Sequence, residues 1–174
     1  MVEEIFLESV LKELREYKDL ADKTFAQLED KDLHFQPNEE CNSIATLIQH
    51  FHGNMLSRWT NFLTEDGEKE WRRRDSEFEV HSFGREQLMK LWEEGWQLTL
   101  NTIESLKPED LSKTVYTRGM PYTVMGAINR QVTHYSSHIG QIILIGKIIK
   151  GKEWQTLSVP RGQSKIYKPH ATKN

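Results

Sequence analysis

Two histidines, His134 and His138, stand four residues apart in a segment with the pattern of a long helix. At about 3.6 residues per turn they lie one above the other on a single face of that helix. Two imidazoles placed in this way can hold one divalent metal ion between them. With a third ligand from another helix they would form a metal site and a candidate active site. Without one, they would be two partly buried histidines.

The helix that must position this pair is predicted over residues 123–150, and it ends with basic residues followed by Gly151. At roughly 100° per residue, His138 lies roughly 40° from His134, and Gln141 roughly 20° to the other side. This stripe borders the apolar arc, so its polar groups need partners or a metal. Tyr135 points into the apolar arc, which makes it a poor proton donor. It also occupies the place where the HExxH zinc motif has its glutamate, so a general base of that type is absent.

Three further segments, 3–28, 43–63 and 84–106, carry apolar residues in steps of three and four, as amphipathic helices do. Ser43 or Asn42 can cap the second of these helices. Four such helices without strong strands predict an all-α fold, a four-helix bundle. The connectors are longer than tight turns, which permits crossover topologies. One of them could form a small hairpin around Arg118-Gly119-Met120.

Composition restricts the class of protein. The chain has 174 residues, a net charge of -3 and a mean hydropathy of -0.67. One bundle domain over 1–151 is expected, with a tail over 152–174 that is either packed on the bundle or disordered. The charge argues against nucleic-acid binding, and no apolar run is long enough to cross a membrane. The acidic first residues do not resemble a signal peptide, so cytoplasmic residence is the default expectation.

Other polar residues leave alternatives open. His50 and His52 both border the apolar face of the second helix, and geometry alone does not choose between them. The adjacent arginines 72–74 lie in a long polar connector, where they could bind an anionic substrate or form a solvated loop. Arg118 and Tyr122 precede the last helix at the expected mouth of the bundle and are candidates for substrate contact. Cys41, the single cysteine, is expected to be inert.

Two motifs resemble the DinB/YfiT-like superfamily of bacterial four-helix bundles. One is Asn42-Ser-Ile-Ala-Thr-Leu-Ile-Gln-His50 after Pro37, and the other is His134-x-x-x-His138-x-Gly140-Gln141. The resemblance covers nearly the whole chain except its last twenty residues. It implies a three-histidine metal site made by His50, His134 and His138. Gln141 would lie near the metal or support helix packing, and His52 would have a packing or supporting role.

The resemblance also implies a function. The arginine-rich connector and the sequence PRGQS in the tail resemble features of an uncharacterised Gram-positive subgroup of this superfamily. Three neutral imidazoles leave an open coordination position on a divalent metal, with zinc or nickel expected. Some relatives are transferases that use a low-molecular-weight thiol, so the leading expectation is a bacillithiol-type S-transferase acting on a small-molecule substrate. The alternatives are a metal-dependent hydrolase and a non-catalytic metal-binding or scaffold protein. Relatives frequently form homodimers, and the same is expected here.

Overall fold

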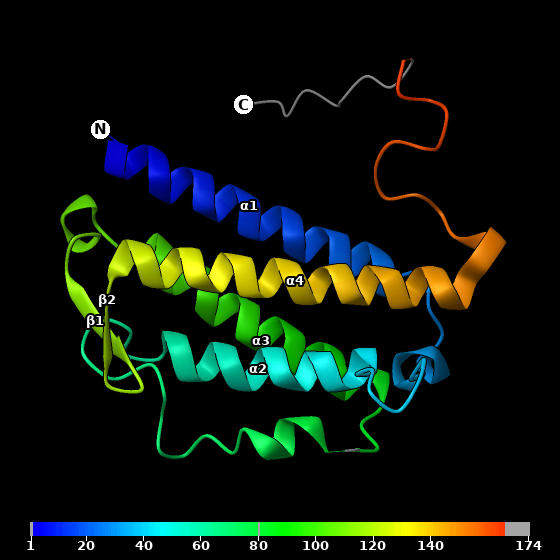
Figure 1. Ribbon diagram of the computed structural model, residues 1–174, viewed down its shortest axis with the longest axis horizontal. Coiled ribbons are helices and arrows are strands. Elements are labelled where there is room, and N and C mark those ends of the chain that lie inside the picture. The colour runs from blue at the N-terminus through cyan, green and yellow to red at the C-terminus, as the bar shows by residue number, and fades with distance from the viewer. Residues whose placement is uncertain (1, 80, 166–174) are drawn as a thin grey trace.

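Four α-helices dominate the computed structural model, which describes residues 2–79 and 81–165 (Figure 1). They are α1 (Val2–Phe25), α2 (Ile44–Trp59), α3 (Arg85–Glu104) and α4 (Val124–Lys150). The predicted all-α bundle is therefore confirmed. Among the described residues, no helix combines the length and the apolarity that crossing a membrane would require.

The chain order of the bundle includes a long crossover. Helices α1 and α4 pack side by side, as do α2 and α3 (Figure 1). Because α2 and α3 run in the same direction, the connector 60–84 has to travel back along the whole of α2 before α3 begins. A short 3-10 helix within it, Asp75–Phe78, packs against α2. The crossover thus places a loop segment beside the helix that carries His50.

Local signals begin α2 and α4 and end α4 where the sequence indicates, whereas α1 and α2 end at Phe25 and Trp59, before the predicted positions 28 and 63. The Ser43 hydroxyl accepts a hydrogen bond from the Thr46 amide at 3.1 Å and caps α2. The Thr123 hydroxyl accepts from the Gly126 amide at 3.0 Å and caps α4. At the other end of α4, Gly151 has a φ of 50°, a backbone conformation that a residue without Cβ adopts at little cost.

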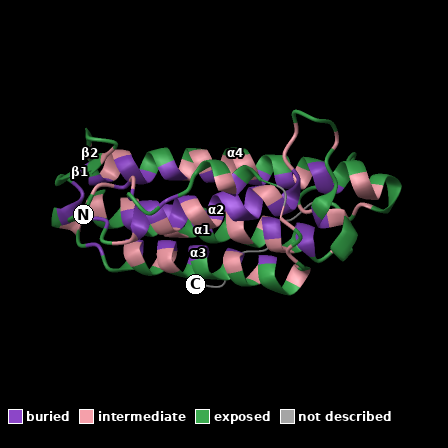
Figure 2. Cartoon of the chain, turned by 90° about the horizontal axis from the view of Figure 1, so that it is seen from below, coloured by how far each residue is buried: buried purple, intermediate pink, exposed green. Residues whose placement is uncertain are grey.

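The helices carry the buried residues that form the core, and Figure 2 marks their positions along the chain. Tyr135 of α4 lies entirely inside this core. Its hydroxyl accepts a hydrogen bond from the Trp59 indole at 2.9 Å and donates one to the Asn54 side-chain oxygen at 3.2 Å. The prediction that Tyr135 points into the core is confirmed, and burial raises the pKa of its phenol. This residue ties α4 to α2 just below the histidine stripe.

Replacing Tyr135 tests how much this polar tie contributes. Tyr135→Phe leaves the Trp59 indole N–H and the Asn54 oxygen without their partner in a buried place. We expect a loss of about 1–3 kcal/mol in the free energy of unfolding, measured by urea denaturation. Tyr116→Phe is the control, since Tyr116 is 51% exposed and should change the stability by less than about 0.5 kcal/mol. Equal effects in the two variants would contradict the tie.

A two-stranded hairpin precedes α4, as the sequence predicts. Its strands are β1 (Thr114–Thr117) and β2 (Met120–Thr123), paired antiparallel. The turn residues Arg118 and Gly119 have φ values of 55° and 70°, which matches the right-handed twist of the strands. The Asp66 carboxylate accepts hydrogen bonds from both turn amides, each at 2.8 Å. The connector after α2 therefore holds the tip of the hairpin.

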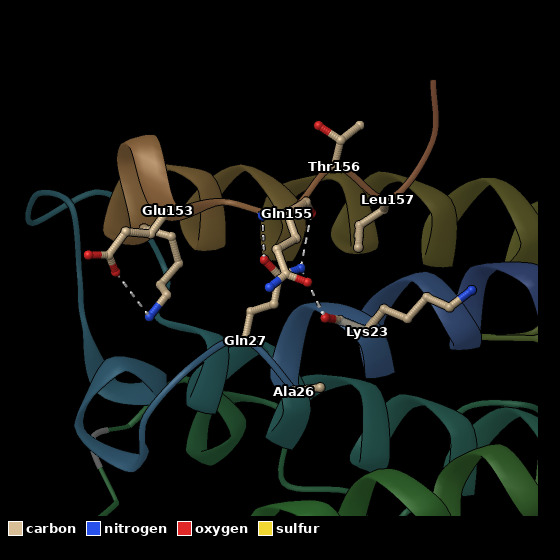
Figure 3. A pocket seen from close by; sticks show the side chains of 8 residues that line it. Lys23, Ala26, Gln27, Glu153, Gln155, Thr156 and Leu157 are labelled. Atoms are coloured by element: carbon tan, nitrogen blue, oxygen red, sulfur yellow. Dashed lines mark hydrogen bonds and ion pairs between the residues drawn. The ribbon is translucent and has the colours of Figure 1, made fainter. Parts of the chain in front are cut away.

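The first part of the tail lies against the end of α1. The Gln155 amide donates to the Gln27 side-chain oxygen at 2.8 Å, and the Gln27 amide group donates back to the Gln155 carbonyl at 3.1 Å (Figure 3). Residues 166–174 of the predicted tail lie outside the described residues. The boundary between a domain over 1–151 and a tail over 152–174 stays a prediction.

Candidate metal centre

Three histidines from two helices meet at one point. His50 comes from α2, and His134 and His138 come from α4. The Nε2 atom of His134 lies 3.2 Å from Nε2 of His50 and 3.0 Å from Nε2 of His138. One ligand atom from each residue lies within 4.8 Å of the others. The three residues predicted as ligands are therefore together, and they could hold one metal ion.

A carboxylate orients His50. Its Nδ1–H donates to the Glu77 carboxylate at 2.9 Å, in a pair whose side chains are only 5% and 8% exposed. Glu77 belongs to the short 3-10 helix of the connector. Since Nδ1 carries the proton, Nε2 of His50 presents a lone pair to the cluster. Metal-binding histidines in proteins almost always have such a partner on the other ring nitrogen.

Arg72 fixes Glu77 in turn. Its Nε and Nη2 atoms donate to the two carboxylate oxygens at 2.7 and 2.8 Å, a bidentate pair with the Arg72 side chain only 2% exposed. Burial by itself raises the pKa of Glu77, but the hydrogen bonds from His50 and Arg72 outweigh it and lower that pKa. Glu77 is thus ionised near neutral pH, which strengthens the hydrogen bond that it accepts from His50.

Gln141, which the resemblance placed near the metal or in helix packing, contacts His138. Its side-chain oxygen accepts a long hydrogen bond, 3.4 Å, from Nδ1 of His138. This contact leaves Nε2 of His138 with its lone pair toward the cluster. Two of the three converging nitrogens are therefore acceptors, and two lone pairs aimed at one place need a proton or a cation between them.

The spacing and the charge of the cluster fit a divalent metal. Two nitrogens bound at about 2.05 Å to one tetrahedral ion lie about 3.3 Å apart, close to the separations of 3.2 and 3.0 Å that His134 Nε2 makes with His50 and His138. Burial, together with the neighbouring His138 and His50, lowers the pKa of His134 to about 3. Burial and His50 also lower the pKa of His138. The imidazoles of His134 and His138 are thus neutral at physiological pH, as metal ligands must be.

An open cavity of about 480 Å³ lies against the three histidines. Asn54, Phe78 and Ser137 contribute to its wall, and so do five arginines. The arginines are Arg58, Arg72, Arg74, Arg118 and Arg130. A metal held by the histidines would therefore face a space of small-molecule size.

The other sequence candidates are distributed around this cavity. His52 pairs with Glu94 of α3 at 3.1 Å, away from the cluster. Arg118 lines the cavity, at the held tip of the hairpin. Tyr122 is absent from the cavity lining, but its hydroxyl accepts a hydrogen bond from Arg130, which does line it, at 2.6 Å. Cys41 is a half-buried free thiol outside the cavity lining.

The arginines 72–74 require a correction. The sequence offered anion binding or a solvated loop for the three together. Arg72 does neither, because it is buried in its pair with Glu77. Arg73 is exposed outside the cavity lining, whereas Arg74 lines the cavity with its guanidinium 5.5 Å from the Phe78 ring centre. Sequence reasoning also missed Glu77, whose only signal was a carboxylate in a long connector.

Gly53 makes room for Glu77 on α2. A Cβ atom at this position would lie 2.6 Å from Cδ of Glu77, inside the closest approach of two carbons. Gly53→Ala should therefore push the carboxylate away from His50, although alanine favours the helix itself. We expect zinc affinity to fall by about tenfold or more, measured by competition with a chromophoric chelator. Gly140→Ala, on α4 with open space at its Cβ, is the matched control. Unchanged affinity in Gly53→Ala would refute this role of Gly53.

Comparison with known proteins yields a family and a fold. No curated protein matches the chain. Its structure is similar to the crystal structure of a conserved protein from Enterococcus faecalis, with 16% identity and a TM-score of 0.64. The match covers 83% of this chain and 96% of that one, and at this identity it supports the fold alone. A family model described as protein of unknown function (DUF1572) matches residues 2–163. The chain therefore belongs to the DUF1572 family.

Proposed function

We propose that this protein is a metal-dependent enzyme of the DinB/YfiT-like superfamily, with zinc or nickel bound by His50, His134 and His138. In its reaction, the sulfur of a low-molecular-weight thiol of the bacillithiol type forms a bond to a small electrophile, the thiol proton passes to solvent, and the leaving group of the electrophile departs with its electron pair. The observation that carries the proposal is the convergence of three Nε2 atoms on an open cavity. A sealed cluster would favour a structural role, because structural metal sites leave no position for a substrate.

The chain's own residues would prepare the site for this reaction. Glu77 and Gln141 hold the rings of His50 and His138 with Nε2 toward the cluster, so no proton has to leave these atoms when a ligand binds. When bound, the metal would lower the pKa of a thiol and supply a thiolate at neutral pH. The cavity would hold the electrophile against it and exclude part of the water. The homodimer expected from the resemblance remains a prediction.

The lining of the cavity favours thiol transfer over hydrolysis. Hydrolysis assisted by a metal also needs a group that protonates the leaving atom. The described residues that line the cavity include no aspartate and no glutamate. Tyr135, the residue beside His134, is buried under the site with its hydroxyl engaged by Trp59 and Asn54. Thiol transfer needs no such acid when the electrophile carries a good leaving group.

An activity assay tests the proposal. Metal-loaded protein is incubated with bacillithiol and monochlorobimane, and the fluorescence of the conjugate is followed. We expect turnover that the His138→Ala variant lacks, because that variant keeps only two of the three ligands. Turnover no greater than that of His138→Ala would exclude the thiol reaction. Zinc-loaded and nickel-loaded samples are assayed in parallel, since either metal suits three imidazoles.

A further inference from the structure

The cavity beside the histidines has an excess of positive charge. Five arginines line it, and the described lining includes no carboxylate. Lysines are absent from the same lining, so the cations present are the planar guanidinium groups that bind carboxylate and phosphate in a bidentate manner. The histidines of the lining carry no negative charge that would offset this excess, and a divalent metal would add to it.

Two carboxylates behind the cavity wall balance only part of this charge. Glu77 is engaged by Arg72 in the bidentate pair described above. Glu68 accepts a hydrogen bond from Arg58 at 2.9 Å and one from the exposed Arg118 at 3.2 Å. Two anions thus serve three of the five arginines, and Arg118 shares its carboxylate with Arg58.

Arg74 and Arg130 have no carboxylate partner among the residues that the structure describes. Arg74 lies near the face of the Phe78 ring, at 5.5 Å from its centre. Arg130 donates to the Tyr122 hydroxyl and lies 5.4 Å from the centre of that ring. Aromatic faces orient a guanidinium without neutralising it. Both groups are exposed, which leaves them free to bind an anion that enters the cavity.

The turn of the β1–β2 hairpin holds Arg118 at the cavity. Its φ of 55° is unusual for a residue with a side chain, and asparagine or glycine would fit that turn position better. Asp66 secures the conformation through the amides of Arg118 and Gly119. The turn therefore fixes the backbone from which the Arg118 side chain reaches the cavity lining.

We infer that the cavity recognises a small molecule with at least two anionic groups, carboxylate or phosphate, through Arg74, Arg130 and Arg118. This inference rests on the proposed function for its identification of that molecule as the substrate. It specifies the substrate class as a polyanionic thiol or a polyanionic electrophile. The arginines hold the anionic groups of this molecule, while its reacting atom, the thiol sulfur or the electrophilic atom, faces the histidines.

Anion binding is tested first without any thiol. Succinate, inorganic phosphate and neutral succinamide are titrated into the full-length protein, as purified and after dialysis against EDTA, and followed by NMR. We expect saturable binding of at least one of the two anions and none of succinamide. Tighter binding of succinate identifies a carboxylate ligand, and tighter binding of phosphate identifies a phosphate ligand. Absence of binding by both anions would overturn the inference.

Substitutions test whether the anions bind at Arg74 and Arg130. Arg74→Gln/Arg130→Gln should weaken anion binding by about tenfold or more, because two charge-assisted contacts are lost. Arg73→Gln is the matched control, since Arg73 is an exposed neighbour in the same connector but does not line this cavity. Equal weakening by Arg73→Gln, or unchanged binding in the double variant, would assign any observed binding to general surface charge and overturn the inference.

A second titration separates this inference from the proposed function. Mercaptosuccinate and 2-mercaptoethanol are compared on cobalt-loaded protein, with the thiolate-to-metal absorption band as the readout. We expect mercaptosuccinate to bind about tenfold or more tightly than 2-mercaptoethanol, and this preference should disappear in Arg74→Gln/Arg130→Gln. Equal affinities would overturn the inference while leaving the metal site intact. Anion binding by a protein that takes up no metal, even after incubation with zinc, nickel and cobalt, would instead support anion recognition by the cavity and refute the metal-dependent enzyme.

Discussion

The His134→Ala/His138→Ala variant is expected to bind no stoichiometric metal, whereas the unaltered chain should carry about one zinc or nickel ion. The physical reason is that this variant keeps a single imidazole, His50, and one neutral ligand does not retain a divalent ion against water. Mass spectrometry of the metal content of untagged protein measures the result. The effect is the largest that we predict, because it is the complete loss of a bound ion.

His52→Ala provides the matched control for this experiment. His52 stands two residues from His50 on the same helix, but it pairs with Glu94 and takes no part in the cluster. Its removal should leave the metal content unchanged. An unaltered protein without metal, even after incubation with zinc and nickel, would reduce the three histidines to packing residues and favour the scaffold alternative.

Glu77→Leu is expected to have the second largest effect, on stability and on metal affinity together. It leaves the Arg72 guanidinium buried without its bidentate partner. Loss of one member of a buried ion pair typically costs about 3–5 kcal/mol. We expect the lower end of that range, because a second carboxylate, that of Glu68, lies 3.7 Å from Nη1 of Arg72. Urea denaturation of EDTA-treated protein measures the change.

The same substitution should weaken zinc binding by about 10–100-fold, since His50 loses the acceptor that fixes its ring. The double variant Arg72→Met/Glu77→Leu separates the two effects. Replacing both charges with apolar side chains should bring the stability back to within about 1 kcal/mol of the unaltered protein. Zinc affinity should stay low, because the acceptor is still missing. A double variant as unstable as Glu77→Leu would show that an unpaired Arg72 is not the cause, and normal zinc affinity in both would refute the support of His50 by Glu77.

The parts of this fold in which apolar residues repeat with the period of a helix could be predicted from the sequence. The helices of the bundle follow the spacing of apolar residues, and the caps at Ser43 and Thr123 satisfy amides within three residues. His134 and His138 share a face for the same reason. The choice of His50 over His52 required the resemblance, since both border the apolar face and only the direction in which α4 packs separates them.

The support of the site could not be predicted in this way. Glu77 and Arg72 lie in a connector without helical period, and their approach to His50 depends on the path of that connector along α2. The same irregular backbone directs three consecutive arginines to three different places. Arg72 is buried in the cavity wall, Arg73 is exposed outside the cavity lining, and Arg74 is exposed within it. Periodicity gives no orientation for such residues, so the three could not be told apart before the tertiary structure was known.

The position of Glu77 on the crossover connector has a thermodynamic consequence. The three histidines that could hold a metal stand on helices of the bundle, but the carboxylate that orients His50 belongs to the connector between α2 and α3. Ion binding and the docking of that segment are therefore linked equilibria, and each must favour the other by the same factor. Any molecule that clamps the connector, including an anion held by Arg74, raises the affinity of the ion. A metal ion bound by the three histidines would in turn raise the affinity for that molecule, and we expect the two to bind cooperatively.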